Sequence, residues 1–357
     1  MKVLFKNRFD CFTTPGGDTT QMLKTKQYLE RLGVSIDVSL SPNDSMKDYD
    51  VIHVFNLMRP LEATLAIKEA KRLNKKVVFS SIYWDFSEYN LVGRNSSIHF
   101  VLNKLLSEFH VEKLKDVIRG RRGIVSYSDF FGYLLSNFKN TLESVDLFLP
   151  NSKNEGDMVK QRVLKSSQVH VVNNAVDKDI FFLINRGIRE KKMLISCRLD
   201  PRKNILNLVK AVKSYPLDIY GSATPSHLKY EQQISAVRGK NVTMKGFVDS
   251  KLLCDIYNEY ALHIMPSWLE TPGLSQLEAA ACGCNIVSTN RGSTSEYFEN
   301  KATYCEPGSL HSIRDAVEQC FDQLHKPNDM SEFILDQYTW DKTAHQTLSA
   351  YEKVLVG

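Results

Sequence analysis

The sequence predicts an α/β protein made of two doubly wound parallel-sheet domains. Its 357 residues exceed the roughly 250–300 residues at which a single hydrophobic core stops growing. Strand-like and helix-like segments alternate along the chain, and the second half repeats the alternation of the first. Such alternation favours parallel sheets covered by helices, with ligands bound at the carboxyl ends of the strands.

In the first half, short apolar runs alternate with amphipathic segments. The predicted strands are 2–5, 34–38, 51–55, 77–81, 147–149 and 169–172, and the predicted helices are 19–32 and 61–73. Residues at the carboxyl ends of these strands are candidates for ligand contact. They are Gly16, Gly17, Asn56, Tyr83, Trp84 and Asp85.

The second half has the same organisation. The predicted strands are 192–197, 217–220, 242–244, 261–265, 285–288 and 303–304, and the predicted helices are 204–214, 250–260 and 277–282. A last helix carries an apolar stripe that needs a partner surface. We expect residues 342–355 to dock on the first domain, the alternative being a helix that caps the second.

The composition is that of an ordinary globular protein, with 43% hydrophobic residues, 24% charged residues and a net charge of +5. The seven cysteines form no CxxC pair, so we expect reduced thiols of a cytoplasmic protein and no metal site. The N-terminus lacks the apolar core of a signal peptide. No segment has eighteen consecutive apolar residues, so no membrane-spanning helix is expected.

Positive charge is concentrated in residues 113–122, which contain Lys113, Lys115, Arg119, Arg121 and Arg122. Apolar and aromatic residues precede and follow this segment. A basic, aromatic-flanked surface can dock on anionic lipid headgroups, which would make peripheral contact with a membrane. The alternative is a solvated helix face beside core aromatics. Nucleic acid is not expected as a partner, because no binding motif accompanies the charge.

The most informative stretch is residues 265–296. Glu270 and Glu278 lie eight positions apart, with Gly273 between them. Because Gly273 has no Cβ, its backbone can come close to a ligand. A helix beginning near Leu274 would aim free N–H groups and the positive end of its dipole at the same loop, which is a ready anion site. Glu278, about one turn inside, can accept hydrogen bonds from a polyol. A diphosphate flanked by two sugar rings would satisfy all these features.

This stretch resembles the family-4 retaining glycosyltransferases of GT-B fold. The family usually carries Pro-Ser-x-x-Glu-Gly-Phe-Gly-Leu where this chain has PSWLETPGL. Gly273 and Leu274 keep the pattern, whereas Thr271 and Pro272 depart from it. The resemblance implies that Glu270 is the catalytic-site residue that contacts the donor sugar, and that Glu278 binds the ribose. The alternative is a chance spacing of two glutamates, against which the small-residue helix that follows is the evidence.

A second segment, SCRLDPRKN at residues 196–204, resembles the family's Gly-Arg-Leu-x-x-x-Lys-Gly. The resemblance implies that Arg198 and Lys203 hold the donor diphosphate, while Cys197 and Asn204 replace glycines. Two fixed cations and a helix N-terminus would stabilise a leaving nucleoside diphosphate without a metal. The alternative is a basic surface loop.

The resemblance covers nearly the whole chain and is tight from about residue 195 to 300. It implies an acceptor-side domain of residues 1–180 with 341–357, a donor domain of residues 188–340, and a cleft between them. Gly16 and Gly17 resemble the loop that approaches the donor phosphates. Many members place a histidine after the strand that corresponds to 77–81, where this chain has none. Asp85 is the candidate for acceptor contact there, and we expect the nearest histidines to be structural or surface residues: His53, His99 and His110.

The resemblance implies a metal-independent retaining glycosyltransferase that needs no cofactor. It would move a sugar from a nucleotide-sugar donor to a hydroxyl of a glycan, lipid-linked or other acceptor, in cell-envelope polysaccharide synthesis. We expect it in the cytoplasm or on the inner face of the membrane. The alternatives are a GT-B nucleotide-sugar epimerase and a non-catalytic nucleotide-sugar binder.

Overall fold

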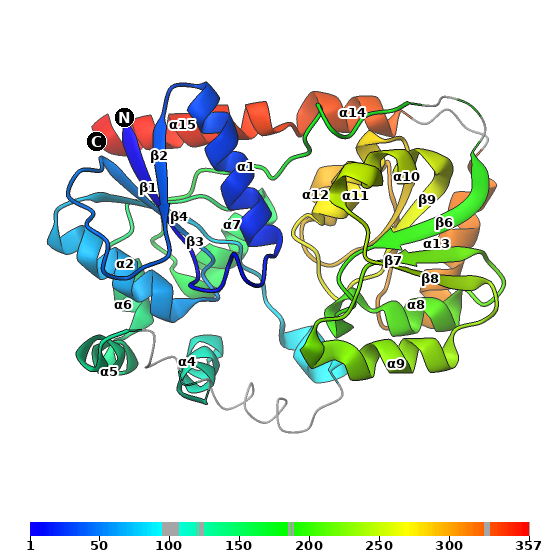
Figure 1. The fold of residues 1–357 in the computed structure, drawn as a ribbon, viewed down its shortest axis with the longest axis horizontal. Helices are drawn as coiled ribbons and strands as arrows, with labels where there is room; N and C mark the ends of the chain where they lie inside the picture. The colour runs from blue at the N-terminus through cyan, green and yellow to red at the C-terminus, as the bar shows by residue number, and fades with distance from the viewer. Residues whose placement is uncertain are drawn as a thin grey trace. The chain divides into compact units, whose positions relative to one another are not determined.

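The computed structural model describes residues 1–94, 107–118, 120, 125–184, 187, 189–324 and 329–356. The chain forms two compact units (Figure 1). Unit 1 consists of Met1–Asp85, Ser97–Asn174 and Trp340–Gly357, and unit 2 of Phe86–Ser96 and Ala175–Thr339. The division expected from the sequence assigns 86–96 to the first domain, whereas the structure groups this segment with the second.

Unit 1 is built on a five-stranded parallel sheet of order β2-β1-β3-β4-β5. Its strands are β1 (Lys2–Lys6), β2 (Ser35–Ser39), β3 (Val51–Phe55), β4 (Lys76–Ser80) and β5 (Leu147–Phe148). The strand predicted at 169–172 is not formed. Val169 makes an isolated bridge with Phe148 instead, so this apolar run flanks the edge of the sheet without extending it.

Helices cover both faces of this sheet. They are α1 (Gly17–Arg31), α2 (Pro60–Arg72), α4 (Glu108–Ile118), α5 (Tyr127–Leu135), α6 (Phe138–Leu142), α7 (Lys153–Met158) and α15 (Trp340–Val356). Side chains alternate along a strand, so Ile52 and Val54 pack in the cluster with α2 while His53 points to the other face. There, His53 Nδ1 lies 2.6 Å from Tyr351 Oη. The last helix α15 thus packs on unit 1, where it also contacts α1.

Unit 2 is built on a six-stranded parallel sheet of order β11-β10-β9-β6-β7-β8. The strands are β6 (Glu190–Ser196), β7 (Leu217–Tyr220), β8 (Val242–Gly246), β9 (Tyr260–Met265), β10 (Asn285–Thr289) and β11 (Thr303–Cys305). The α-helices are α8 (Ile205–Ala211), α9 (Leu228–Val237), α10 (Leu253–Glu259), α11 (Leu274–Ala281), α12 (Thr294–Phe298), α13 (Leu310–Asp322) and α14 (Met330–Gln337). Short 3-10 turns η4 (Pro201–Lys203), η5 (Pro225–His227) and η6 (Ser250–Leu252) precede three of them.

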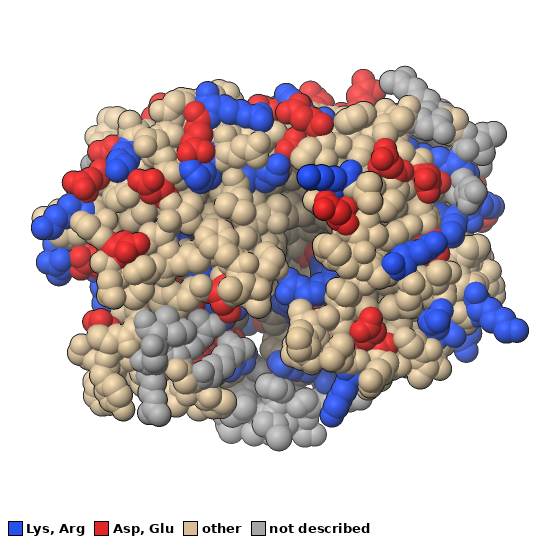
Figure 2. All heavy atoms as spheres, viewed as in Figure 1, with Lys and Arg blue, Asp and Glu red and all other residues tan. Residues whose placement is uncertain are grey.

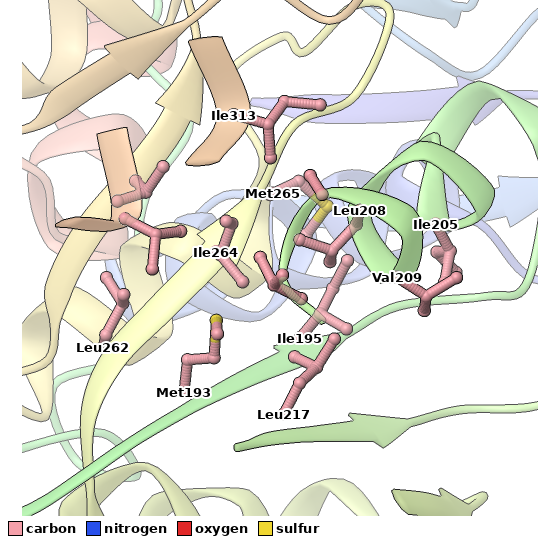
Figure 3. Packing of buried hydrophobic residues seen from close by; sticks show 14 of the residues in the cluster. Met193, Ile195, Ile205, Leu208, Val209, Leu217, Leu262, Ile264, Met265 and Ile313 are labelled. Carbon is pink, nitrogen blue, oxygen red and sulfur yellow. The ribbon is translucent and has the colours of Figure 1, made fainter. Parts of the chain in front are cut away.

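The two faces of this sheet bury separate apolar clusters. One cluster contains Met193, Ile195 and Leu262 from the strands and is closed by α8 and α13, as Figure 3 shows. The other contains Leu194 from β6 and is closed by α10, α11 and α14. Because consecutive residues of β6 enter opposite clusters, the strand is buried on both sides, as expected for a parallel sheet. The predicted α/β class with two doubly wound parallel sheets is confirmed.

The visible surface carries charges of both signs. Figure 2 shows Lys and Arg side chains interspersed with Asp and Glu over most of the face in view. In the described part of the chain, no helix is both long and apolar enough to cross a membrane.

Candidate functional site

The site in unit 2 is built where the strand order reverses. From β6 the chain moves outward to β7 and β8, and it then returns to the other side of β6 as β9. In open parallel sheets the loops on the two sides of such a reversal separate and leave room for a ligand at the carboxyl ends of the strands. The loops that follow β6 and β9 contain residues 197–204 and 266–273.

A lysine–glutamate pair joins these two loops. Lys203 Nζ donates a hydrogen bond to Glu270 Oε1 over 2.6 Å. The glutamate side chain is 6% exposed and the lysine side chain 28% exposed. A main-chain bond adds to this link, since the Trp268 N–H donates to the Arg202 carbonyl at 2.9 Å. Two residues that lie 67 positions apart are therefore held together at the end of the sheet.

The carboxylate of Glu270 lies beside the start of α11. Gly273 precedes the helix with a φ of +86°, a conformation that favours glycine. A Cβ at this position would lie 3.2 Å from Glu270 Oε2 and 2.8 Å from Gln276 Oε1. In the first helical turn the Gln276 N–H already donates to the Gly273 carbonyl at 2.9 Å, whereas the earlier N–H groups, beginning at Leu274, have no carbonyl one turn before them in the helix. The positive end of α11 therefore lies against an acidic side chain, which can in turn hold a polar ligand.

The main chain of Glu270 is fixed by the loop after β10. The Ser293 N–H donates to the Glu270 carbonyl at 2.9 Å, and Glu270 forms an isolated parallel bridge with Gly292. Gly292 has a φ of +92°, and a Cβ there would lie 1.9 Å from the Glu270 oxygen. Only glycine fits this contact, so residues 290–293 determine where the glutamate stands.

Asn204 and Cys197, which stand where the family has glycines, are accommodated in different ways. Asn204 adopts the left-handed conformation with φ 59°, which asparagine tolerates better than most residues. Its Nδ2 donates to the carbonyls of Pro266 at 2.9 Å and Pro307 at 2.7 Å. At Cys197, burial raises the thiol pKa to about 12. The residue that has to be glycine for close backbone contact is Gly221, because a Cβ there would lie 1.8 Å from the Cys197 oxygen.

Arg198 and Glu278 occupy the same end of the unit. Arg198 is exposed on the loop after β6, and Glu278 is half-buried about one turn inside α11. Burial, and then the charge of Glu278, raise the pKa of Tyr257 well above its usual value. Tyr257 Oη lies 2.6 Å from Ser196 Oγ at the end of β6. The Glu278 carboxylate is therefore close to the carboxyl end of β6.

His263 is a buried, uncharged histidine close to Lys203. His263 is fully buried on β9, and its Nε2 lies 3.2 Å from Ser196 Oγ. Burial, reinforced by the charge of Lys203, lowers the pKa of His263 to about 3. The ring is therefore uncharged at neutral pH, and it does not compete with the lysine for an anion.

The sequence did not reveal that residues 86–94 pack against the loops of this site. The carboxylate of Glu88 accepts two bonds from Arg291, at 2.7 Å from Nε and 3.1 Å from Nη2. Arg291 also reaches Glu306 at 2.7 Å. A Cβ at Gly93 would lie 2.7 Å from Trp268 Cε2, so this segment packs on the indole ring. Arg291 could have been found from the sequence, because it follows β10 at the carboxyl end of the sheet. Glu88 could not, because nothing near it in the sequence indicates a partner 203 positions away.

The predicted site residues of unit 1 also lie at strand ends. Gly16 is the N-cap of α1 and Gly17 its first residue. Beside them, Arg8 Nε donates to Asp18 Oδ2 at 2.6 Å, and Asn56 Nδ2 donates to the same oxygen at 3.2 Å. The Asn56 bond to this buried ion pair connects the loop after β3 to the segment after β1, where the strand order of unit 1 reverses.

At the end of β4, Asp85 pairs with Arg162 at 2.5 Å. Tyr83 is fully buried, and its hydroxyl donates to Glu108. His53 lies in the core of unit 1, and His110 bonds Ser107 at 2.6 Å. Four residues named from the sequence lie outside the described residues: His99, Arg119, Arg121 and Arg122. Among the described residues, no group of three or more His, Cys, Asp or Glu side chains could hold a metal ion.

Comparisons with known proteins find a family match in the second half of the chain. Residues 177–335 match the model of the family described as glycosyl transferases group 1. A probable sucrose-phosphate synthase of Thermosipho melanesiensis is 27% identical over 205 residues, which are 52% of this chain and 48% of that protein. The chain spans about half or less of the first curated relatives that it matches.

Two solved structures share the fold over nearly their whole length. The sucrose-phosphate synthase of Thermosynechococcus elongatus has a TM-score of 0.73 at 15% identity, covering 100% of this chain and 99% of that chain. Anabaena HepE in complex with UDP-glucose has a TM-score of 0.69 at 14% identity, covering 99% and 100%.

The fold and the site thus define a GT-B protein. The recognition made from the sequence is confirmed for the class: residues 177–335 match the model of the glycosyl transferases group 1 family, and the chain has the GT-B fold.

Proposed function

We propose that this protein is a retaining glycosyltransferase that uses a nucleotide-sugar donor. The observation that carries the proposal is the Lys203–Glu270 pair, with its carboxylate beside Gly273 at the start of α11. A cation, a carboxylate and a helix N-terminus at one strand reversal match the three chemical parts of such a donor. These parts are a diphosphate and two hydroxylated rings.

Each donor-side residue has a role in this proposal. Lys203, Arg198 and the amides near Gly273 and Leu274 stabilise the negative charge that develops on the leaving diphosphate. Glu270 accepts hydrogen bonds from the hydroxyls of the sugar and orients it. Glu278 accepts hydrogen bonds from the ribose. In the mechanism proposed for the family, a phosphate oxygen of the donor takes the proton of the acceptor hydroxyl, so no strong protein base is needed.

The finer parts of the proposal concern the acceptor and the location. The acceptor is a hydroxyl of a glycan or lipid-linked molecule in cell-envelope polysaccharide synthesis, met in the cytoplasm or on the inner face of the membrane. Gly16 and Gly17 are proposed to approach the donor phosphates, and Asp85 the acceptor. Contact with the membrane in the region of residues 113–122 belongs to the same proposal. Among relatives, the UDP-glucose complex of HepE supports the donor class.

A panel of nucleotide sugars tests the proposal against its two alternatives. The protein is incubated with each donor, with and without candidate acceptors, and donor hydrolysis, epimerisation and transfer are followed by chromatography. Transfer with retention at the anomeric carbon is expected. A new nucleotide sugar without transfer would indicate an epimerase, and binding without any turnover would indicate a nucleotide-sugar sensor.

Metal independence is a separate expectation. Two cations and a helix N-terminus supply the positive charge that a divalent ion supplies elsewhere. Transfer should therefore proceed at an unchanged rate in EDTA. A strict requirement for an added divalent ion would contradict this model of the site.

A further inference from the structure

We infer that residues 86–94, called here the strap, position the Lys203–Glu270 pair for turnover. The strap belongs to unit 2, although the segments of chain before and after it belong to unit 1. Glu88 and Gly93 of the strap are positioning residues, because they act through the loops that carry the pair. The inference rests on the proposed function only for what the pair does once it is in place.

The first contact of the strap fixes the loop after β10. The Glu88 carboxylate accepts bonds from Arg291 Nε at 2.7 Å and from Nη2 at 3.1 Å, which is a bidentate pair. The Arg291 carbonyl accepts from the Glu270 N–H at 3.4 Å, and the Ser293 N–H donates to the Glu270 carbonyl at 2.9 Å. The main chain of Glu270 is therefore bonded twice to a loop that the strap holds.

The second contact fixes the loop after β9. Trp268 lies two residues before Glu270, and it is 6% exposed. A Cβ at Gly93 would lie 2.7 Å from Trp268 Cε2 and 2.8 Å from its Nε1, so the strap backbone lies directly against the indole ring. A Cβ at Gly308 would lie 3.5 Å from the same ring. Two glycine backbones thus pack on Trp268 and fix the start of the loop that carries the glutamate.

The third contact reaches the loop after β6. The Arg202 guanidinium carbon lies 5.9 Å from the centre of the Phe86 ring, within range of a cation–π interaction. The Arg202 carbonyl also accepts from the Trp268 N–H at 2.9 Å, and Lys203 follows it in the chain. The strap thus contacts three loops that hold the pair. One carries Lys203, one carries Glu270, and one bonds the main chain of Glu270.

Turnover depends on the geometry of the pair more steeply than binding does. A displacement of about 1 Å in a group that orients the reacting sugar can lower a rate by about 100-fold. The attraction between a cation and a diphosphate falls only slowly with distance. Loosening the strap should therefore lower kcat, while the affinity for a nucleoside diphosphate changes little. Salt should have the same effect, because the Glu88 and Arg291 side chains are 42% and 32% exposed and their attraction is screened.

Three single variants of the full chain test the inference. Glu88→Gln removes the charge that holds Arg291, and Gly93→Ala puts a Cβ against Trp268. The matched control is Glu306→Gln, because Glu306 is a second carboxylate that Arg291 binds, at 2.7 Å. The Glu306 side chain is 48% exposed, against 42% for Glu88. The control removes an equal charge from the same arginine and leaves the strap attached.

Hydrogen–deuterium exchange in the absence of nucleotide measures whether the strap holds the loops. The N–H groups of Trp268, Glu270 and Ser293 are each bonded to another of these loops. Peptides that cover them should exchange about tenfold faster in Glu88→Gln and Gly93→Ala than in the native protein and the control. Peptides of β7 should exchange at the native rate in all variants, which would show that the loosening is local. Unchanged exchange in both strap variants would overturn the inference.

Kinetics with UDP-glucose as the donor probe and calorimetry with UDP measure the consequence for turnover. In the two strap variants kcat should fall about tenfold, with the affinity for UDP within about twofold of the native value. The control should keep both native values. At saturating donor, the native kcat should fall as salt is raised, and this dependence should disappear in Glu88→Gln.

Two results separate the inference from the proposed function. Faster exchange of the loops without any loss of kcat would overturn the inference, because the strap would then hold the loops without affecting turnover. A native protein that turns over neither UDP-glucose nor any other nucleotide sugar would refute the proposed function. The exchange experiment contains no nucleotide, so it would still decide whether the strap positions the pair.

Discussion

Glu270 and Glu278 have different surroundings, and their replacement should have different consequences. Glu270 is buried and paired with Lys203, whereas Glu278 is half-buried on α11. Glu278→Ala removes a charged acceptor worth roughly 1.5–3 kcal/mol, so donor binding should weaken by about 10- to 100-fold. Glu270→Ala should mainly reduce turnover, because the sugar loses its orientation. Steady-state kinetics separate the two effects, and wild-type kinetics in both variants would refute the donor-site assignment.

Lys203 and Arg198 should each contribute to binding of the diphosphate. Lys203→Ala removes a cation and leaves the Glu270 carboxylate facing the phosphates, so the loss should exceed that of Arg198→Ala. Calorimetry with a nucleoside diphosphate measures both, and unchanged affinity would contradict the assignment. The matched control is Lys301→Ala. Lys301 is also ion-paired, and its side chain is 25% exposed, similar to that of Lys203. It precedes β11, at the amino edge of the sheet, so its loss should leave affinity unchanged.

At the scale of elements, the loop after β10 determines where Glu270 stands. Gly292→Ala would put a Cβ 1.9 Å from the Glu270 carbonyl oxygen, so the backbone has to move. A non-glycine residue in this conformation also costs about 1–3 kcal/mol. We expect both a lower denaturation midpoint and reduced turnover.

Gly246→Ala separates the cost of the backbone conformation from the loss of the contact with Glu270. Gly246 has a φ of +75°, but nothing lies within 4 Å of an added Cβ. This variant should lose only the stability that the backbone conformation costs and keep its turnover per folded molecule. If the two variants lose the same fraction of activity, the Gly292 contact does not position the glutamate.

At the scale of the whole molecule, the described part of each unit contains one buried neutral histidine whose protonation should couple to stability. Burial lowers the pKa of His53 to about 3, and burial with the charge of Lys203 lowers that of His263 to about 3. An unfolded histidine titrates near 6.5, so between about pH 6.5 and 3 the unfolded chain binds more protons. Stability is therefore fully present above about pH 6.5 and is lost as the pH falls toward 3, by up to about 1.4 kcal/mol per pH unit for each histidine.

Urea denaturation as a function of pH measures this coupling. His53→Gln should flatten the acid limb for unit 1, and His263→Gln should flatten it for unit 2. Fluorescence transitions of the two units can differ, since a chain of two units need not unfold in one step. Acid limbs parallel to that of the native protein would show that neither histidine controls acid stability.

The sequence predicted most of the sheets, because apolar runs with helical segments between them are local signals. Strand Val51–Phe55 and strand Leu217–Tyr220 have the predicted limits. The strand predicted at 169–172 was wrong, because an apolar run can pack beside the edge of a sheet without pairing along it. Lys203 and Glu270 were named individually from the family pattern, but their contact follows from the pairing of β6 with β9.

By itself, the sequence determined the α/β class, the donor-side candidates and the basic segment, because these depend on periodicity and on short motifs. Only the tertiary structure decided which candidates meet, that Gly292 holds the main chain of Glu270, and that Glu88 clasps Arg291. It also showed that only part of the apolar side chains of α4 and α5 is buried. The physical reason is that such contacts join residues far apart in the chain, and their geometry depends on strand order and helix packing that no local pattern encodes.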